Sequence, residues 1–483
     1  MAIIQTRLWI GGAFRDAVSG ATFLDLNPEG DQPYAEASRA SSADVELAMQ
    51  AAHRAFAAYR ETAPAAREKW LGNAAELLEA RAEAFLEVLI DEIGSPRIKA
   101  QFELAYALAH LRAAAGIPRR ICGLTLPSDT PGRFSIAIRE PLGVFACITP
   151  FNVPLIKAMK QCTGPLATGN TVVTLASEHA PVLALRVAEL FRDAGFPAGS
   201  FNVLTGFGEE IGDSLVAHPL NRGLNFTGST SVGRHLSALC GRHFKRCLLE
   251  LGGKSPLVIL EDADLEAAVQ GAVAGMFLYQ GQVCMGSSRI IVQRAVLGEF
   301  IGRFKLAAEA VGHGDLRDPD TWIGPIISAR QRARIQRHID DAVARGATVV
   351  TGNRWLGNRC LPTILSGVTP DMRCYDEETF GPVAAVHAVD SVDAALELAN
   401  DTAYGLSGAI YTRDLDAALR LARGIHAGML HINAPSLYDE PHAPFGGVGD
   451  SGMGREGTVT DIDHCTEWKW ITIQTPGAAH APH

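Results

Sequence analysis

From residue 142 onward, short and continuously apolar runs alternate with segments of helical length. These runs occupy residues 142–148, 171–175, 201–204, 224–226 and 256–260. Strands that are buried on both faces have this composition, and an intervening segment such as 181–194 has the length of a crossover helix. The pattern predicts βαβ units and therefore a doubly wound parallel sheet of the nucleotide-binding kind.

A second alternating pattern follows over about residues 254–450. Segments of helical periodicity lie at residues 265–279 and 329–345, and strand-like runs lie at residues 289–292 and 347–350. Because helices and strands alternate again, we expect a second α/β domain in this half of the chain.

We infer the secondary structure of the remaining segments from the spacing of their apolar residues. The first third is interpreted as helical, with apolar residues three and four apart over 43–59 and 65–93. Two runs far apart in the sequence, 134–139 and 468–474, alternate with a period of two and predict an outlying sheet. Residues 476–483 are rich in Ala, Pro and His and are expected to be loosely held.

Composition and charge exclude several classes of protein. The chain has 483 residues, 47% apolar and 20% charged, enough for roughly three domain-sized units. Its formal net charge is −10 and it has no prominent basic run, so nucleic acid is not expected as a partner. It has no stretch of about 18 consecutive apolar residues and no recognisable secretion signal at its N-terminus. We therefore expect a cytoplasmic protein that does not bind a membrane.

The nine cysteines are scattered, and no two of them form a Cys-x-x-Cys pair. This argues against both a zinc site and a disulfide framework, so no metal site is expected. Cys284 differs from the rest because Gly281-Gln-Val-Cys284 lies between a helical run and a strand. A loop there would present its sulfur as a nucleophile, although a lone cysteine is more often a small core residue.

Two polar residues beside apolar runs are further candidates. Glu250 lies between leucines and is followed by two glycines, and an apolar setting would raise its pKa toward that of a general base. The alternative is a carboxylate paired with Lys254. Asn152 follows a buried strand and precedes a helix, so its amide could donate to a developing oxyanion. Alternatively, Asn152 is only a turn residue.

A glycine-containing segment at residues 226–233 follows a predicted strand and opens a helix. Ser229 and the neighbouring amides would face a pyrophosphate at the positive end of that helix. A second glycine cluster at residues 206–208 lacks the spacing of the G-x-G-x-x-G pattern and is interpreted as a turn.

Six motifs taken together resemble the NAD(P)-dependent aldehyde dehydrogenase superfamily, in the family's order and over nearly the whole chain. They are Thr149-Pro-Phe-Asn152, Phe226-Thr-Gly-Ser-Thr230, Leu249-Glu-Leu-Gly-Gly-Lys254, Gly281-Gln-Val-Cys284, Glu378-Thr-Phe-Gly-Pro382 and Pro444-Phe-Gly-Gly447. The resemblance implies a Rossmann-like doubly wound NAD-binding domain, an α/β catalytic domain and a small β bridging element. The NAD-binding domain would comprise residues 1–120 and 142–252, and the catalytic domain residues 253–452. The bridging element would comprise residues 121–141 and 453–483.

The resemblance also implies roles for individual residues. Cys284 is the nucleophile, Glu250 the general base, and Asn152 with the Cys284 backbone N–H the oxyanion hole. A thiohemiacetal on Cys284 would give a thioester that water hydrolyses to a carboxylic acid. The residues expected to contact the cofactor are Thr149, Pro150, Phe151, Glu178, Gly228, Ser229, Gly233, Leu251, Glu378 and Phe380.

One position departs from the family's pattern. The family usually has a lysine three residues before Glu178, where it contacts the adenine ribose or a 2′-phosphate, and this chain has Leu175. The cation is missing and Glu178 would repel a phosphate, so we predict NAD rather than NADP as the cofactor.

Within the superfamily, the chain is similar to the bacterial benzaldehyde and vanillin dehydrogenases, which implies an aromatic aldehyde as the substrate. Lys157, Lys160, Tyr438 and Phe445 are the predicted substrate-binding residues. The two lysines are three residues apart on one helix face, where one of them would meet an anionic end of the substrate. Alternatively, both are solvated.

Two other functions stay open at this point. One is a dehydrogenase of an aliphatic aldehyde or semialdehyde, and the other is a non-catalytic nucleotide-binding homologue that kept the fold. The resemblance further implies that the bridging element extends the sheet of a neighbouring subunit, which would give a homodimer or homotetramer.

Overall fold

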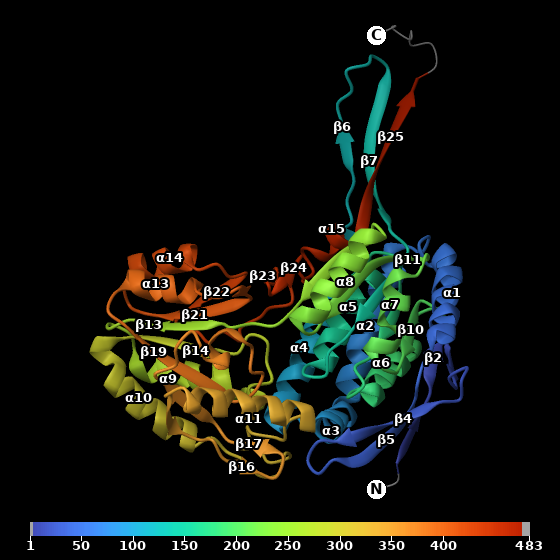
Figure 1. The fold of residues 1–483 in the computed structure, drawn as a ribbon. Coiled ribbons are helices and arrows are strands. Elements are labelled where there is room, and N and C mark those ends of the chain that lie inside the picture. Colours follow the sequence, from blue (N-terminus) through green and yellow to red (C-terminus); the bar gives the residue numbers. More distant parts are fainter. Residues whose placement is uncertain (1–2, 476–483) are drawn as a thin grey trace.

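Within residues 3–475, which the computed structural model describes, two large sheets covered by helices form the body, and a narrow sheet projects from it (Figure 1). The prediction for residues 476–483 lies outside the described residues. The structure is of the α/β class, as predicted. None of the described helices is both long and apolar enough to cross a membrane.

The first large sheet has the strand order β24-β12-β11-β8-β9-β10-β2-β3. Its parallel centre consists of β8 (Val144–Ile148), β9 (Thr171–Leu175), β10 (Phe201–Leu204), β11 (Asn221–Thr227) and β12 (Arg246–Glu250). The crossover helices are α5 (Pro154–Ala167), α6 (Pro181–Asp193), α7 (Gly208–Ala217) and α8 (Thr230–Arg242). The predicted βαβ units are thus confirmed, and β12 adds a strand that the sequence pattern did not reveal.

The interpretation of the first third as helical was wrong for its beginning. Residues 4–38 form β1 (Ile4–Thr6), β2 (Leu8–Ile10), β3 (Ala13–Arg15), β4 (Thr22–Asn27) and β5 (Gln32–Ser38). Of these, β2 pairs antiparallel with β10 and so completes an edge of the first sheet, together with β3. The other three strands form a separate small sheet in the order β1-β5-β4.

The helices that follow are α1 (Ser42–Tyr59), α2 (Pro64–Ala80), α3 (Ala82–Ile93) and α4 (Arg97–Ala115), with a short 3₁₀ turn at Pro118–Arg120. The predicted helix 65–93 is therefore two helices. They are separated because Arg81 leaves helical geometry, with φ −105° and ψ 16°. The apolar spacing continues across the break, so periodicity did not reveal it.

The second large sheet has the order β15-β18-β19-β14-β13-β21-β22. Its strands are β13 (Pro256–Ile259), β14 (Arg289–Gln293), β15 (Thr348–Thr351), β18 (Thr363–Ser366), β19 (Val383–Val389), β21 (Ser407–Tyr411) and β22 (Met429–Ile432). The accompanying helices are α9 (Leu265–Phe277), α10 (Arg294–Glu309), α11 (Ala329–Ala344), α12 (Arg373–Asp376), α13 (Val392–Asn400) and α14 (Leu415–Gly424). Short ribbons pair β16 (Trp355–Leu356) with β17 (Arg359–Cys360), and β20 (Tyr404–Gly405) with β23 (Val448–Gly449).

The projecting sheet, which we call the arm, contains β6 (Leu124–Leu126), β7 (Arg133–Pro141) and β25 (Thr466–Gln474) in the order β25-β7-β6 (Figure 1). Strands β7 and β25 pair antiparallel along their whole lengths, with Trp468 opposite Arg139. The predicted pairing of 134–139 with 468–474 is therefore confirmed. Just before β25, β24 (Gly452–Met453) pairs with β12, and α15 (Asp461–Cys465) leads into the arm.

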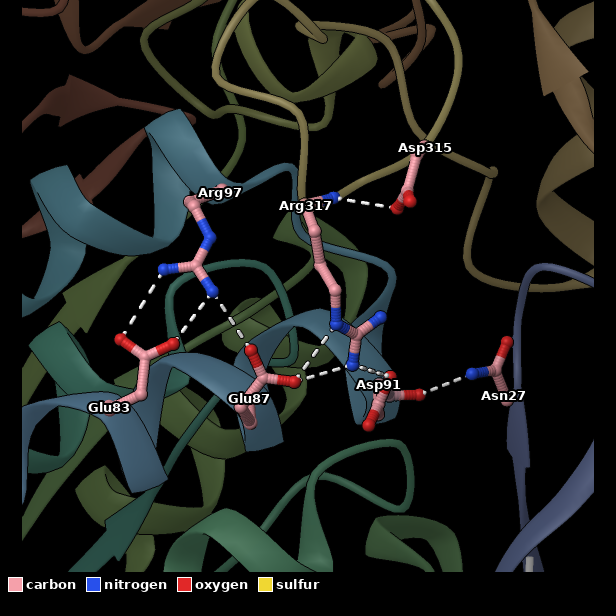
Figure 2. A network of polar contacts seen from close by, with 7 residues as sticks. All are labelled: Asn27, Glu83, Glu87, Asp91, Arg97, Asp315 and Arg317. Atoms are coloured by element: carbon pink, nitrogen blue, oxygen red, sulfur yellow. Dashed lines mark hydrogen bonds and ion pairs between the residues drawn. The ribbon is translucent and has the colours of Figure 1, made fainter.

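A polar network fastens the loop between α10 and α11 to helix α3 (Figure 2). The Arg317 guanidinium lies 3.0 Å from Glu87 and 2.9 Å from Asp91, both on α3. Arg97, at the start of α4, also reaches Glu87 at 2.9 Å. Since this loop leads into α11, the network helps to set the position of α11 relative to the first sheet.

Candidate active site

Cys284 lies where two cavities meet, in the segment between α9 and β14. The larger cavity has a volume of about 410 Å³ and runs along the carboxyl ends of β8, β9 and β11. The smaller has a volume of about 260 Å³. Cys284 and Asn152 line both cavities, so a ligand in either one can approach the same sulfur.

The loop that carries Cys284 turns sharply directly after α9. Tyr279, Gln280 and Gly281 have φ values of 50°, 45° and 68°, which is left-handed backbone. The Gln280 side chain supports the turn, because its amide donates to the Pro325 carbonyl at 2.8 Å and accepts from the Gly324 N–H at 2.9 Å. For this reason the helix predicted over 265–279 ends two residues early.

The two glycines after Glu250 allow close backbone contacts beside the sulfur. A Cβ atom on Gly253 would lie 2.3 Å from the Cys284 carbonyl oxygen, and one on Gly252 would lie 2.5 Å from Glu378 Oε2. The Gly253 N–H donates to Glu378 Oε1 at 2.9 Å. Only glycine fits at either position without displacing the Cys284 loop or the Glu378 carboxyl group.

Asn152 is positioned to donate a hydrogen bond next to the sulfur. Its side chain is buried, and its amide nitrogen donates to the Gln282 carbonyl oxygen at 2.9 Å. An amide nitrogen carries two hydrogens, so one N–H remains to serve a ligand at the junction of the cavities. Asn152 and Cys284 thus line the same junction of the two cavities, where an oxyanion hole would need both groups.

The Cys284 thiol lies in an environment that favours its neutral form. Burial raises the pKa of Cys284 to about 12, and the nearby Lys157 ammonium opposes this only in part. Burial also acts to lower the pKa of Lys157, but Glu456 and Glu250 outweigh it and raise that pKa above its usual value. Without a ligand, the sulfur is therefore protonated near neutral pH, and a base or an added charge is needed to activate it.

Glu250 ends strand β12, with its carboxyl group buried and with no hydrogen-bond partner among residues 3–475 for either oxygen. Burial raises its pKa well above the usual value. The alternative pairing with Lys254 is absent from the described residues, because Lys254 Nζ donates to the Cys374 carbonyl at 2.7 Å. The carboxyl group lies against Gly446, where an added Cβ would be 2.6 Å from Oε1. Glu250 is not among the described residues that line the two cavities.

The larger cavity collects nearly all the residues predicted to bind a cofactor. Those that line it are Thr149, Pro150, Phe151, Glu178, Gly228, Ser229, Leu251, Glu378 and Phe380. Ser229 caps helix α8 and accepts from the Val232 N–H at 3.4 Å. Gly233 is not part of the lining within residues 3–475. A Cβ there would lie 2.4 Å from Leu251 Cδ2, so Gly233 serves helix packing.

Glu378 lines the larger cavity, and its carboxyl group accepts a hydrogen bond from the Gly253 N–H. Burial raises its pKa to about 7, against the bond from the Gly253 N–H. Close by, the Phe380 and Phe151 rings meet edge to face at 5.9 Å, and His179 meets the Phe151 ring at the same distance. Phe151 and Phe380, which come from two different family motifs, therefore form one continuous part of the cavity wall.

The sequence analysis missed the contribution of α11 to this wall. Gln331 donates to the carbonyls of Thr379 and Phe380 at 2.8 Å, and Arg334 Nε donates to the Glu378 carbonyl at 3.1 Å. Both residues line the larger cavity. No local signal distinguishes them, because the sequence of α11 is that of an ordinary amphipathic helix with two exposed arginines, Arg330 and Arg337.

The smaller cavity has a largely apolar and aromatic wall. Its aromatic residues are Phe102, Tyr106, Tyr279, Tyr438 and Phe445. The two predicted lysines also line it, but the alternative of two solvated side chains is wrong, because both are buried. Lys157 Nζ lies 2.6 Å from Glu456, and Lys160 Nζ lies 2.8 Å from Asp439.

Comparisons with known proteins agree with this geometry. The family model described as the aldehyde dehydrogenase family matches residues 14–471. A vanillin dehydrogenase of Pseudomonas fluorescens is 42% identical over 99% of this chain and 100% of its own. A benzaldehyde dehydrogenase of Bacillus subtilis is 37% identical over 96% of each chain. The crystal structure of a salicylaldehyde dehydrogenase from Pseudomonas putida G7, complexed with salicylaldehyde, has a TM-score of 0.96 and 37% identity, covering 99% of this chain and 100% of that one.

Proposed function

The chain belongs to the aldehyde dehydrogenase family, and from that premise we propose that it oxidises aromatic aldehydes to carboxylic acids with NAD as the hydride acceptor. Oxidation of an aldehyde is the activity that the family and the named relatives share. The observation that carries the proposal is the position of Cys284 and Asn152, which line both the cofactor cavity and the smaller cavity.

In the proposed reaction, the Cys284 thiol loses its proton to water, and the thiolate Sγ attacks the carbonyl carbon of an aldehyde held in the smaller cavity. The oxygen that gains charge lies between the free Asn152 N–H and the Cys284 backbone N–H. Bound NAD supplies the acceptor for the hydride, and a thioester on Cys284 remains. Glu250 then takes a proton from the water that hydrolyses this thioester. For that step its carboxyl group turns from Gly446 toward the sulfur, and its lack of hydrogen-bond partners among residues 3–475 supports such freedom.

The lining of the larger cavity fits a nicotinamide dinucleotide. Ser229 and the N-terminus of α8 offer donors for a diphosphate, while Glu178 and Glu378 offer carboxyl groups for two ribose units. Glu178 lines this cavity, and its side chain is 43% exposed with the His179 ring 3.8 Å away. A 2′-phosphate beside Glu178 would be repelled, and Leu175 provides no cation. This supports NAD over NADP.

The cofactor preference is tested by comparing kcat/KM for NAD and for NADP with one aldehyde. We expect at least a tenfold preference for NAD. Leu175→Lys is expected to raise kcat/KM for NADP more than for NAD, because Leu175 lines the larger cavity and a lysine there would supply a cation for the 2′-phosphate. A wild-type preference for NADP would contradict the assignment.

The smaller cavity supports an aromatic substrate because its wall combines aromatic rings with aliphatic side chains around the reactive sulfur. The test is the rate of reduced nicotinamide formation with benzaldehyde, vanillin, a short aliphatic aldehyde and succinate semialdehyde. Cys284→Ala serves as the inactive control. Activity with only the short aliphatic aldehyde and succinate semialdehyde would agree with the proposed mechanism but would show that the substrate is not an aromatic aldehyde.

The proposal includes the organisation of the protein. Residues 1–120 with 142–252 form the NAD-binding domain, 253–452 the catalytic domain, and 121–141 with 453–483 the bridging element, through which homodimers or homotetramers assemble. The exposed side chains of Trp470 and Ile473 on the arm support an interface there. A cytoplasmic location also belongs to the proposal and is supported by the nine cysteines, all of which are free thiols.

A further inference from the structure

Three lysines contribute to the wall of the smaller cavity. Lys99, Lys157 and Lys160 all line it, and Asp439 is the carboxylate that accompanies them among the described lining residues. On this count of charges alone, the cavity would attract an aldehyde that carries a carboxylate at its far end. The ion pairs around the cavity reverse that expectation.

Each of the three lysines already has a carboxylate partner. Lys99 pairs with Glu103, four residues along α4. Lys157 Nζ lies 2.6 Å from Glu456, and both side chains are at most 3% exposed. Lys160 Nζ lies 2.8 Å from Asp439 and 3.8 Å from Glu456, with the lysine side chain 1% exposed. Three cations and three carboxylates therefore cancel within the protein.

The Lys160–Asp439 pair differs from the other two pairs in its position. Glu103 and Glu456 do not line the cavity within the described chain, whereas Asp439 does. Lys160 Nζ also lies 3.9 Å from the centre of the Phe445 ring, so a carboxylate and a ring face already surround its ammonium group. An anionic substrate would have to displace Asp439 or lie beside it.

Either arrangement is unfavourable for an anion. A carboxylate that enters this apolar cavity loses its hydration, and no uncompensated cation offsets that loss. If it stays near Asp439, two like charges repel each other in a medium of low polarity. A neutral aldehyde suffers neither penalty.

We propose that Asp439 is a specificity-determining residue, which neutralises Lys160 and so excludes aldehydes that carry a negative charge. The inference rests on the proposed function, since it concerns the substrates of the same site. It narrows the substrate class to uncharged aldehydes, and it implies that removal of the Asp439 charge alone would turn Lys160 into a receptor for an anion.

The first experiment uses the wild-type protein with three para-substituted aldehydes: benzaldehyde, 4-carboxybenzaldehyde and methyl 4-formylbenzoate. The ester is neutral and larger than the acid, so it separates an effect of charge from one of size. We expect kcat/KM for the acid to be at least about 100-fold below that for the ester. An acid within about threefold of the ester would overturn the proposal.

The second experiment measures the ratio of kcat/KM for the acid to that for benzaldehyde in each variant. We expect Asp439→Asn to raise this ratio at least tenfold, because two lysines, Lys157 and Lys160, then share the single carboxylate of Glu456 and leave one positive charge uncompensated. The double variant Lys160→Met/Asp439→Asn removes both charges and is expected to return the ratio to its wild-type value. Glu440→Gln, which removes a carboxylate from the neighbouring position of the same loop, is expected to leave the ratio unchanged.

The two proposals fail in different ways. If the wild-type protein oxidises benzaldehyde but Asp439→Asn leaves the ratio unchanged while remaining folded by thermal unfolding, the role of Asp439 is wrong and the proposed function stands. If the wild-type protein oxidises neither benzaldehyde nor the ester, the proposed function itself is wrong. If Asp439→Asn does not fold, Asp439→Ser takes its place in the test of Asp439, and the wild-type comparison of acid and ester still tests whether anionic aldehydes are excluded.

Discussion

The Asn152 amide nitrogen lies 2.9 Å from the Gln282 carbonyl oxygen, and this hydrogen bond joins the start of α5 to the loop that carries Cys284. The bond connects residues 130 positions apart in the sequence. It fixes the amide plane, so that the second N–H of Asn152 has a defined direction at the junction of the two cavities.

Replacement of Asn152 tests this arrangement. We expect Asn152→Ala to lower kcat by about 10² to 10³, because an oxyanion donor acts mainly in the transition state. Binding of NAD, followed by tryptophan fluorescence or calorimetry, is expected to change by less than about threefold. A fall in NAD affinity as large as the fall in kcat would assign Asn152 a role in holding the loop instead.

The protonation state of Cys284 gives a prediction about pH. Because burial raises its pKa to about 12, the thiolate fraction without cofactor is expected to rise tenfold for each pH unit between pH 7 and pH 10. Alkylation of Cys284 by iodoacetamide should rise with it and show no plateau in that range. The measurement uses a Cys122→Ser/Cys247→Ser background, since Cys122 is exposed and Cys247 is partly exposed. A plateau near pH 8 would show that the thiol is already activated without a ligand.

Glu250 is predicted to act after hydride transfer. We expect Glu250→Gln to lower the steady-state rate by about 10² to 10⁴, the range of general base catalysis. A burst of about one reduced nicotinamide per site should persist in rapid mixing, because the thioester still forms. Loss of the burst together with the steady-state rate would instead place Glu250 in the activation of Cys284.

Gly253 is predicted to be essential for the shape of the site rather than for folding. An added Cβ would lie 2.3 Å from the Cys284 carbonyl oxygen, so Gly253→Ala must displace the loop. We expect a loss of activity of at least about 100-fold, as small displacements of reacting groups are costly. Gly302→Ala on α10 is the matched control, since no atom lies within 4 Å of a Cβ there, and it should retain full activity. Equal losses in the two variants would show a general sensitivity to alanine.

The arm provides a prediction about assembly. The Trp470 side chain is 68% exposed and Ile473 is 52% exposed on β25, an edge strand of the arm in the described chain. We expect Trp470→Asp combined with Ile473→Asp to reduce the molar mass seen by light scattering to that of a smaller species. The melting temperature of the body should change little, because the arm projects from it (Figure 1). An unchanged mass would exclude these two side chains of β25 from the interface.

Some features of the fold were accessible from local sequence and others were not. The buried parallel strands β8 to β11 and the alternation within β7 and within β25 follow from hydrophobic patterns that a short window contains, and the pairing of β7 with β25 was inferred from their shared period of two. The N-terminal strands did not, because β1, β3, β4 and β5 mix polar and apolar residues, while β2 has only three residues and gains its order from its partner β10. The break at Arg81 was hidden for a related reason, since the apolar spacing continues through it.

The sequence by itself determined which chemical groups this protein has and in which order: a loop cysteine, an acid among leucines, an amide before a helix and the motifs of the aldehyde dehydrogenase family. Only the tertiary structure decided their relations. It placed Asn152 beside the Cys284 loop, turned the Glu250 carboxyl group toward Gly446, and added Gln331 and Arg334 to the cavity wall. It also paired Lys160 with Asp439 across 279 positions. Such relations depend on contacts between distant segments, and the charge that a cavity offers to a ligand is a sum over all of them.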